Sequence, residues 1–216
     1  MSTKTTFLIV IMLLTAITLV GLLLWNQLPD QMASHWGADD QANGTSSKFW
    51  GVFLVPIMGT FMAALFLAIP SIDPLKANIA QFRESFNVFT ILMVIFMAYV
   101  QGLTLAWNLG FTNFRMSAAL LPAMGLLFFF VGDMVRKAKR NFFIGIRTPW
   151  TLSSDSVWDE THRIGGQLFK VSGILALVGA LFPAYALWFM LIPLLGSTIF
   201  TVAYSYVLFQ RESANA

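Results

Sequence analysis

The sequence contains no cysteine, which excludes disulfide bonds, thiolate metal sites and a cysteine nucleophile. It is also poor in charge: charged residues make up 11% of its 216 residues, whereas a soluble domain is about one quarter charged. Hydrophobic residues make up 57% and the mean hydropathy is +0.74. The composition therefore predicts an integral membrane protein. It leaves no basic soluble domain for direct binding to nucleic acid.

Long apolar runs predict the membrane spans, since about 20 apolar residues in a helix cross the hydrocarbon core of a bilayer. The stretch 168–209 is too long for one span, and we expect Pro183 to divide it. The first run lacks a small-residue cleavage site after it, so we expect a retained helix rather than a signal peptide. We therefore predict an all-α, polytopic fold with six transmembrane helices, at 7–25, 50–70, 86–107, 116–133, 168–182 and 186–209.

The basic residues predict the orientation, because Lys and Arg concentrate on the cytoplasmic side of a membrane. With six spans, most of the 13 Lys and Arg residues lie on the side of the two termini, and only Lys48 and Arg115 lie on the other. We expect a protein of the bacterial plasma membrane with both termini and the segment 141–169 in the cytoplasm. The first loop, 26–49, is then extracytoplasmic.

Ionisable residues are scarce within the spans. Asp133 and Lys170 lie at span ends and none lies in the middle of a span. Ion-coupled transporters carry their coupling charge on such a residue, so its absence argues against a secondary transporter.

The first loop is rich in turn-forming residues, and His35, Asp39 and Asp40 lie near one another in it. Carboxylates beside an imidazole can bind a divalent ion. We favour a structural His–Asp hydrogen bond over a metal site, and expect no cofactor. Trp36 is typical of an anchor at the membrane interface.

The segment 141–169 is dense in Arg, Trp, Gly and His although it connects two apolar runs. We expect Thr148 to be extended because it precedes Pro149. Ser153 or Ser154 then caps a short amphipathic helix in this fourth loop, which runs to about Arg163. Asp159 and Arg163 are spaced as an i,i+4 ion pair. Gly165 and Gly166 would let the chain turn sharply into the fifth span.

Two residues of this segment have a structural and a functional interpretation. His162 is either a hydrogen-bonded structural residue, which we favour, or a general base. Arg147 either partners a buried carboxylate or a helix C-terminus, or belongs to a surface that docks a partner. Those two alternatives for Arg147 stay open.

Two motifs resemble known families. The first loop resembles the DUF1648 motif, and the segment 141–169 resembles the SdpI motif over a longer and more specific pattern. We divide the chain into a DUF1648-like region, 1–70, and an SdpI-like region, 71–216. The residues that match the DUF1648 motif are Leu28, Pro29, Asp30, His35, Trp36, Gly44, Ser47 and Lys48. Those that match the SdpI motif are Asn141, Gly145, Ile146, Arg147, Thr148, Pro149, Trp150, Thr151, Leu152, Val157, Trp158, Thr161, His162, Arg163, Gly165 and Gly166.

The resemblance implies a bacterial multi-pass immunity protein that protects its cell against a secreted, membrane-active toxic peptide. The best-known member of the family also senses that peptide and holds a cytoplasmic repressor at the membrane. The implied partners are therefore the lipid bilayer, a toxic peptide and a repressor protein.

We expect binding rather than catalysis. An exporter of a small solute or peptide, or a membrane-embedded metal-dependent enzyme, is the alternative. The candidate functional residues of the cytoplasmic segment are Asn141, Gly145, Arg147, Thr148, Pro149, Trp150, Trp158, Thr161, His162, Arg163, Gly165 and Gly166. The candidate sensing residues of the first loop are Pro29, His35, Trp36, Gly44 and Lys48.

Overall fold

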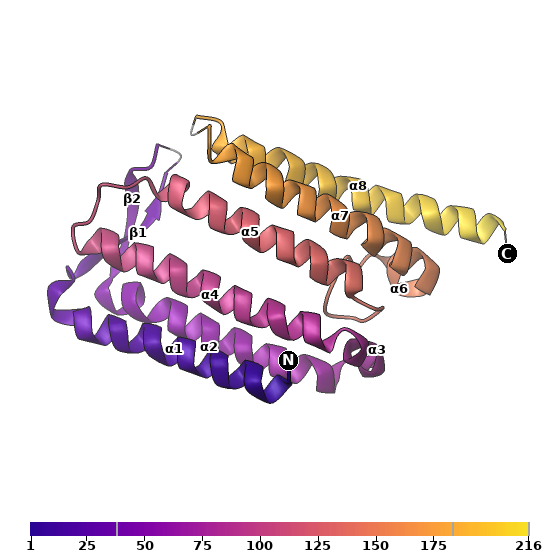
Figure 1. The fold of residues 1–216 in the computed structure, drawn as a ribbon, viewed down its shortest axis with the longest axis horizontal. Helices are drawn as coiled ribbons and strands as arrows, with labels where there is room; N and C mark the ends of the chain where they lie inside the picture. Colours follow the sequence, from indigo (N-terminus) through magenta and orange to yellow (C-terminus); the bar gives the residue numbers. More distant parts are fainter. Residues whose placement is uncertain (38, 183, 216) are drawn as a thin grey trace.

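A computed structural model describes residues 1–37, 39–182 and 184–215. It is mostly helical, with long helices lying side by side and one small sheet (Figure 1). The elements before the midpoint of the chain are α1 (Thr3–Leu24), η1 (Trp25–Gln27), β1 (Gln31–Trp36), β2 (Ala42–Ser47), α2 (Lys48–Ile72), α3 (Lys76–Gln81) and α4 (Arg83–Asn108). Those after it are α5 (Met116–Lys137), α6 (Pro149–Ser153), α7 (Asp155–Gly179) and α8 (Ala186–Ala214).

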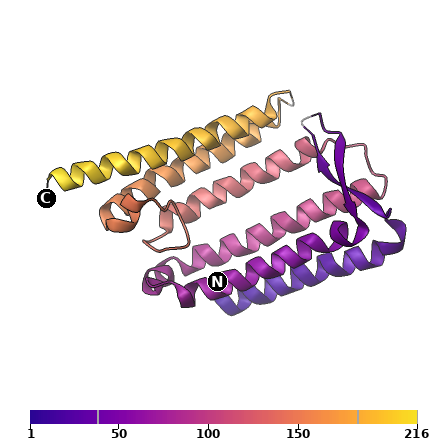
Figure 2. The same cartoon turned by 180° about the vertical axis from the view of Figure 1, so that it is seen from behind.

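The long helices form two groups of three, with α1, α2 and α4 in one and α5, α7 and α8 in the other (Figures 1 and 2). The two strands lie at one end of the bundle, which we call the hairpin end. At the other end, the motif end, lie α6, α3 and both termini. The two segments that the sequence singles out therefore occupy opposite ends of the bundle.

Five helical segments are long and apolar enough to cross a membrane: α1 with η1, α2, α4, α5 and α8. Many of their large apolar side chains are exposed, as is usual for surfaces that face lipid. The predicted span 168–182 lies mostly in α7, whose first half carries charged residues. The count of six spans stays a prediction, as does the side of the membrane on which each end lies. The predicted break at Pro183 falls outside the described residues, while α7 ends at Gly179 and α8 begins at Ala186.

The predicted sharp turn at Gly165 and Gly166 is wrong, because α7 continues through both residues. These glycines instead let neighbouring elements approach closely. A Cβ at Gly166 would collide with the carbonyl oxygen of Gly132 on α5, and one at Gly165 would meet the Thr201 side chain on α8 at 3.0 Å. The predicted surface helix and most of the predicted fifth span thus form one helix, packed between α5 and α8.

The first loop is not all turns, so an all-α fold is wrong at this point: β1 and β2 form an antiparallel hairpin. Met32 is fully buried beneath it, in a cluster with Leu28, Val52 and Leu105. The Asn108 side chain, near the end of α4, exchanges two hydrogen bonds with the backbone of β1. These long-range contacts hold the short strands in place, and the local sequence pattern does not reveal them. The two bonds run from Ala33 N to Asn108 Oδ1 at 2.7 Å and from Asn108 Nδ2 to Ala33 O at 3.0 Å.

Candidate functional site

Asn141 organises the loop between α5 and α6 at the motif end. Its side chain is fully buried, and its amide group donates to the carbonyl oxygens of Lys139 and Ile144, both at 2.8 Å. Its Oδ1 accepts from the backbone N–H groups of Phe143 at 2.9 Å and Ile144 at 2.6 Å. All four hydrogen bonds are local, so Asn141 shapes the loop and presents no free polar atom.

His162 joins this loop to α7. Its Nε2 accepts from Ile146 N at 2.9 Å, so Nδ1 carries the proton and donates to Trp158 O at 2.8 Å. The ring stacks on the indole of Trp158 at 3.9 Å, and the Trp158 Nε1 donates to Ala138 O at 2.8 Å. Burial lowers the pKa of His162 to about 4, so the imidazole is neutral at pH 7. Gly145 lies against the ring with φ +116, which leaves no room for a side chain.

This geometry supports the structural interpretation of His162, because both ring nitrogens have backbone partners. A general base needs a free nitrogen with a pKa near the working pH. The imidazole has neither.

Thr148 and Thr151 begin α6 and attach it to α8. Thr148 is extended, as predicted, and forms a reciprocal capping box with Thr151, with Pro149 at the first helical position. The Thr148 Oγ1 also lies 3.1 Å from the Ser205 Oγ on α8. The predicted cap of the next helix is confirmed as well, since the Ser154 side chain accepts from the N-terminal backbone of α7.

The charged residues of α7 pair differently from the prediction. Arg163 forms two hydrogen bonds with Glu160, of 2.6 and 2.8 Å, whereas Asp159 pairs with Lys139 at 3.0 Å. The bonds from Arg163 hold the pKa of the Glu160 carboxyl below its usual value. The partner of Asp159, Lys139, lies in the loop after α5. This ion pair therefore depends on how that loop packs against α7. Thr161 is fully buried on the opposite face, and its hydroxyl has no partner among the described residues.

Arg147 is exposed, and its guanidinium donates to Phe142 O at 2.6 Å. It has no carboxylate partner among the described residues. The buried carboxylate nearby is Asp73, which accepts from Leu75 N at 2.6 Å at the start of the segment that leads into α3 and from Phe142 N at 2.9 Å. The sequence indicated Asp73 as a helix cap, but it gave no sign of the bond to Phe142. Of the two interpretations of Arg147, the docking surface is the one that its exposure supports. Trp150, three residues further along the chain, packs on Tyr206 of α8, with ring centroids 5.0 Å apart.

At the hairpin end, His35 pairs with Asn43 rather than with an aspartate, so the predicted His–Asp hydrogen bond is wrong. The His35 Nδ1 lies 2.5 Å from Asn43 Oδ1 across the hairpin. Gly44 is opposite His35, and a Cβ there would meet the His35 Cβ at 3.0 Å. Trp36 packs edge-on against Trp107 of α4 at 5.7 Å, so it is a contact of the bundle end.

Lys48 and Pro29 lie where the hairpin meets the helices. The Lys48 Nζ forms an ion pair with Asp30 at 3.0 Å and lies 5.6 Å from the ring centre of Trp25. Lys48 thus joins the two ends of the first loop, and Pro29 is exposed beside it. The contacts of Lys48 support a structural role for that residue.

Asp40 fastens the hairpin tip to α5. Its carboxylate accepts from Ser117 N at 2.7 Å and from Ser117 Oγ at 2.8 Å, in the first turn of α5. An acceptor at that position satisfies a helical N–H and interacts favourably with the helix dipole. Asp40 adopts φ +62, an uncommon conformation that aspartate tolerates better than most residues. Within the described part of the chain, no three His, Asp or Glu side chains are grouped to hold a metal ion.

A cavity of about 900 Å³ opens beneath the hairpin tip, between α4, α5 and the start of α8. We call it the hairpin cavity. It was not foreseen from the sequence, because its walls come from four separate segments. The polar part of its wall includes Trp36, Asp39 and Arg115, and the apolar part includes Leu121, Met124 and Met190. The indole N–H of Trp36 is buried and has no partner among the described residues.

The comparisons with known proteins confirm the predicted resemblance to the SdpI family. Residues 137–205 match the model of the SdpI/YfhL protein family, and residues 7–60 match DUF1648, a domain of unknown function. The chain is similar to the Immunity protein SdpI of Bacillus subtilis (strain 168), with 24% identity over 196 residues. That alignment covers 89% of this chain and 90% of the relative. No solved structure matches.

Proposed function

We propose that this protein is a membrane immunity protein that protects a bacterial cell against a secreted, membrane-active toxic peptide. The observation that carries the proposal is the similarity to an immunity protein along 89% of the chain, including both ends of the bundle. The family match at 137–205 covers the whole of the loop between α5 and α6 that Asn141 and His162 organise.

We propose that protection depends on binding, without a chemical step. The hairpin cavity has the volume and the mixed polar and apolar lining that are typical of ligand sites. With the orientation predicted from the basic residues, it opens on the outer side, where a secreted peptide arrives. At the motif end, the exposed Arg147 and Phe142 are available to a cytoplasmic repressor. The tightly packed His162 region supports the shape of that surface.

Helix α5 connects the two ends. Its first turn is held by Asp40 from the hairpin, and Ala138, directly after its last residue, accepts from Trp158. A ligand in the hairpin cavity can signal through α5 only if it binds two arrangements of the bundle with different affinity. We propose that a change in the position of α5 is the signal.

The test is survival of a sensitive bacterium under a panel of membrane-active peptides. Leu120→Trp fills part of the hairpin cavity, and Leu195→Trp places the same side chain on an exposed face of α8 as the matched control. We expect the wild type and Leu195→Trp to protect, and Leu120→Trp to lose protection at equal abundance in the membrane.

Arg147→Ala distinguishes protection from signalling. We expect this variant to keep protecting while it fails to co-purify a cytoplasmic partner. Protection by Leu120→Trp equal to that of the wild type would contradict peptide binding in the cavity. Energy-dependent efflux of a labelled peptide from vesicles would favour the exporter alternative.

A further inference from the structure

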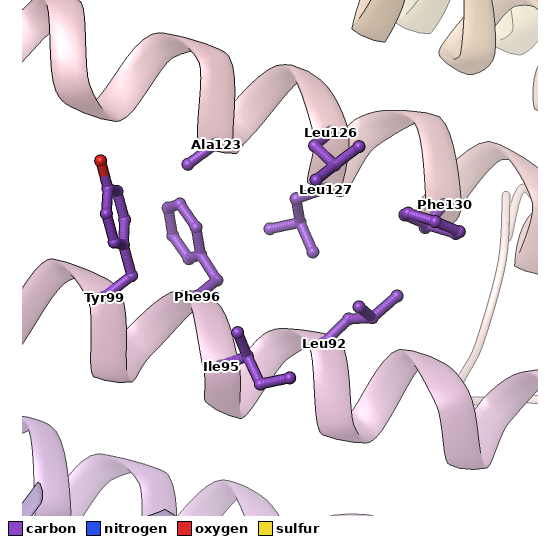
Figure 3. A pocket seen from close by; sticks show the side chains of 8 residues that line it. All are labelled: Leu92, Ile95, Phe96, Tyr99, Ala123, Leu126, Leu127 and Phe130. Atoms are coloured by element: carbon purple, nitrogen blue, oxygen red, sulfur yellow. The ribbon is translucent and has the colours of Figure 1, made fainter.

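A second, apolar cavity lies on the side of the bundle, between the two groups of helices. Figure 3 shows its walls, with side chains of α4 facing side chains of α5. Its volume is about 190 Å³, and the one polar group in the picture is the Tyr99 hydroxyl. That hydroxyl donates to Ala119 O at 3.1 Å and so closes one end of the cavity. The residues that line it are Leu92, Ile95, Phe96, Tyr99, Ala123, Leu126, Leu127 and Phe130.

The cavity continues toward the motif end. An adjoining cavity of about 300 Å³ shares Leu92 and Phe130 with it. The far end of that second cavity is polar and carries both signs of charge, from Glu84, Asp133 and Lys137. We call the two cavities together the α4–α5 trough.

The polar end of the trough has groups to offer a ligand. The Lys137 and Glu84 side chains are 56% and 76% exposed, although Lys137 contacts Asp133 at 2.7 Å and Glu84 contacts the N-terminal amine at 2.8 Å. Such exposed ion pairs are weak, so a ligand can replace them at little cost. Ser85 also lines this end, and its hydroxyl has no hydrogen bond to the described residues.

The length of the apolar part matches one leaflet of a bilayer. Val88 and Tyr99 are eleven residues apart on α4, which corresponds to about 16 Å along the helix axis at a rise of about 1.5 Å per residue. Half of a hydrocarbon core is about 15 Å. The trough is open on its side, since Ile95, Leu126 and Phe130 are 46%, 51% and 38% exposed.

We propose that the α4–α5 trough binds one phospholipid with a zwitterionic, ammonium-bearing head group. An acyl chain lies along the apolar walls, Lys137 and Ser85 bind the phosphate, and Glu84 binds the ammonium. An anionic head group would add negative charge beside the Glu84 and Asp133 carboxylates and would bring no ammonium for Glu84 to bind. The lipid would fill the seam between the two helix groups and strengthen it. This site is separate from the hairpin cavity and does not depend on the immunity proposal.

The proposal is tested by measuring which lipids the full-length protein retains. The protein is reconstituted in nanodiscs of equal parts phosphatidylethanolamine and phosphatidylglycerol, extracted in mild detergent, and examined by native mass spectrometry. Ala123→Phe fills the apolar part, and Lys137→Ala removes the phosphate contact. Ile199→Phe, on a side chain of α8 that is 69% exposed and does not line the trough, is the matched control.

We expect the wild type and Ile199→Phe to retain one phosphatidylethanolamine per chain. Ala123→Phe should lower that retention about tenfold, equivalent to about 1.4 kcal/mol, and Lys137→Ala should also lower it. Circular dichroism checks that the variants keep their helical content. The proposal is wrong if the wild type retains no phospholipid. It is equally wrong if Ala123→Phe retains as much as the control, or if phosphatidylglycerol is retained as well as phosphatidylethanolamine.

Discussion

Acid should destabilise this protein through one residue, His162. Its side chain is 1% exposed and neutral, and Ile146 N donates to its Nε2. Protonation would convert that nitrogen into a donor that faces another donor. The folded protein therefore resists protonation, which is why burial lowers the pKa of His162 to about 4 from 6.5.

The sign and size of the effect follow from the two pKa values. Between pH 6.5 and pH 4 the unfolded chain takes up a proton on this residue that the folded protein does not. Stability is therefore complete above pH 6.5 and falls as the pH drops toward 4. The free energy lost by pH 4 is about 3 kcal/mol, at about 1.4 kcal/mol for each pH unit between the two values.

The assay is unfolding in detergent micelles at a series of pH values from 7.5 to 4.5. The chain has two histidines, and the exposed His35 provides the matched control. His162→Gln keeps a hydrogen-bond acceptor but does not titrate, so it should lose most of the pH dependence in this range. His35→Gln should keep it. Amide exchange at Ile146 should accelerate with acid in the wild type.

Parallel pH profiles for the wild type and His162→Gln would refute this reasoning. So would a profile that flattens in His35→Gln instead. Either result would mean that His162 is not held neutral by the fold. The neutral, structural role of the residue would then have to be abandoned.

Two further substitutions test single contacts. Gly145→Ala should destabilise the protein by about 1–3 kcal/mol, because its φ of +116 strains a side chain that also meets the imidazole. Gly102→Ala, where an added Cβ meets nothing within 4 Å, should leave the unfolding midpoint near or above that of the wild type. Asp40→Ala should cost about 1 kcal/mol by removing the cap of α5, and hydrogen exchange should rise at Ser117. Asp39→Ala, one residue earlier, should leave that exchange unchanged. If it raises exchange equally, the assigned cap is wrong.

The sequence by itself determined the features that depend on neighbouring residues. Five of the six predicted spans are helices of membrane-spanning length, because a long apolar run needs no partner to be recognised. The extended Thr148 and the Ser154 cap were also predicted, since both depend on residues within one turn. The family resemblance depends on motif residues that follow one another closely along the chain.

Tertiary structure decided the features that depend on distant partners. Glu160, three residues away, competes with Asp159 for Arg163, and Asp159 is drawn to Lys139 on another segment. Of the glycine pair expected to turn the chain, Gly166 instead lets α5 approach α7, and Gly165 lets Ile146 and α8 approach it. The β-hairpin exists because Asn108 and Asp40 dock it on α4 and α5. The hairpin cavity and the α4–α5 trough are shaped by elements that meet only after folding, so no local pattern encodes them.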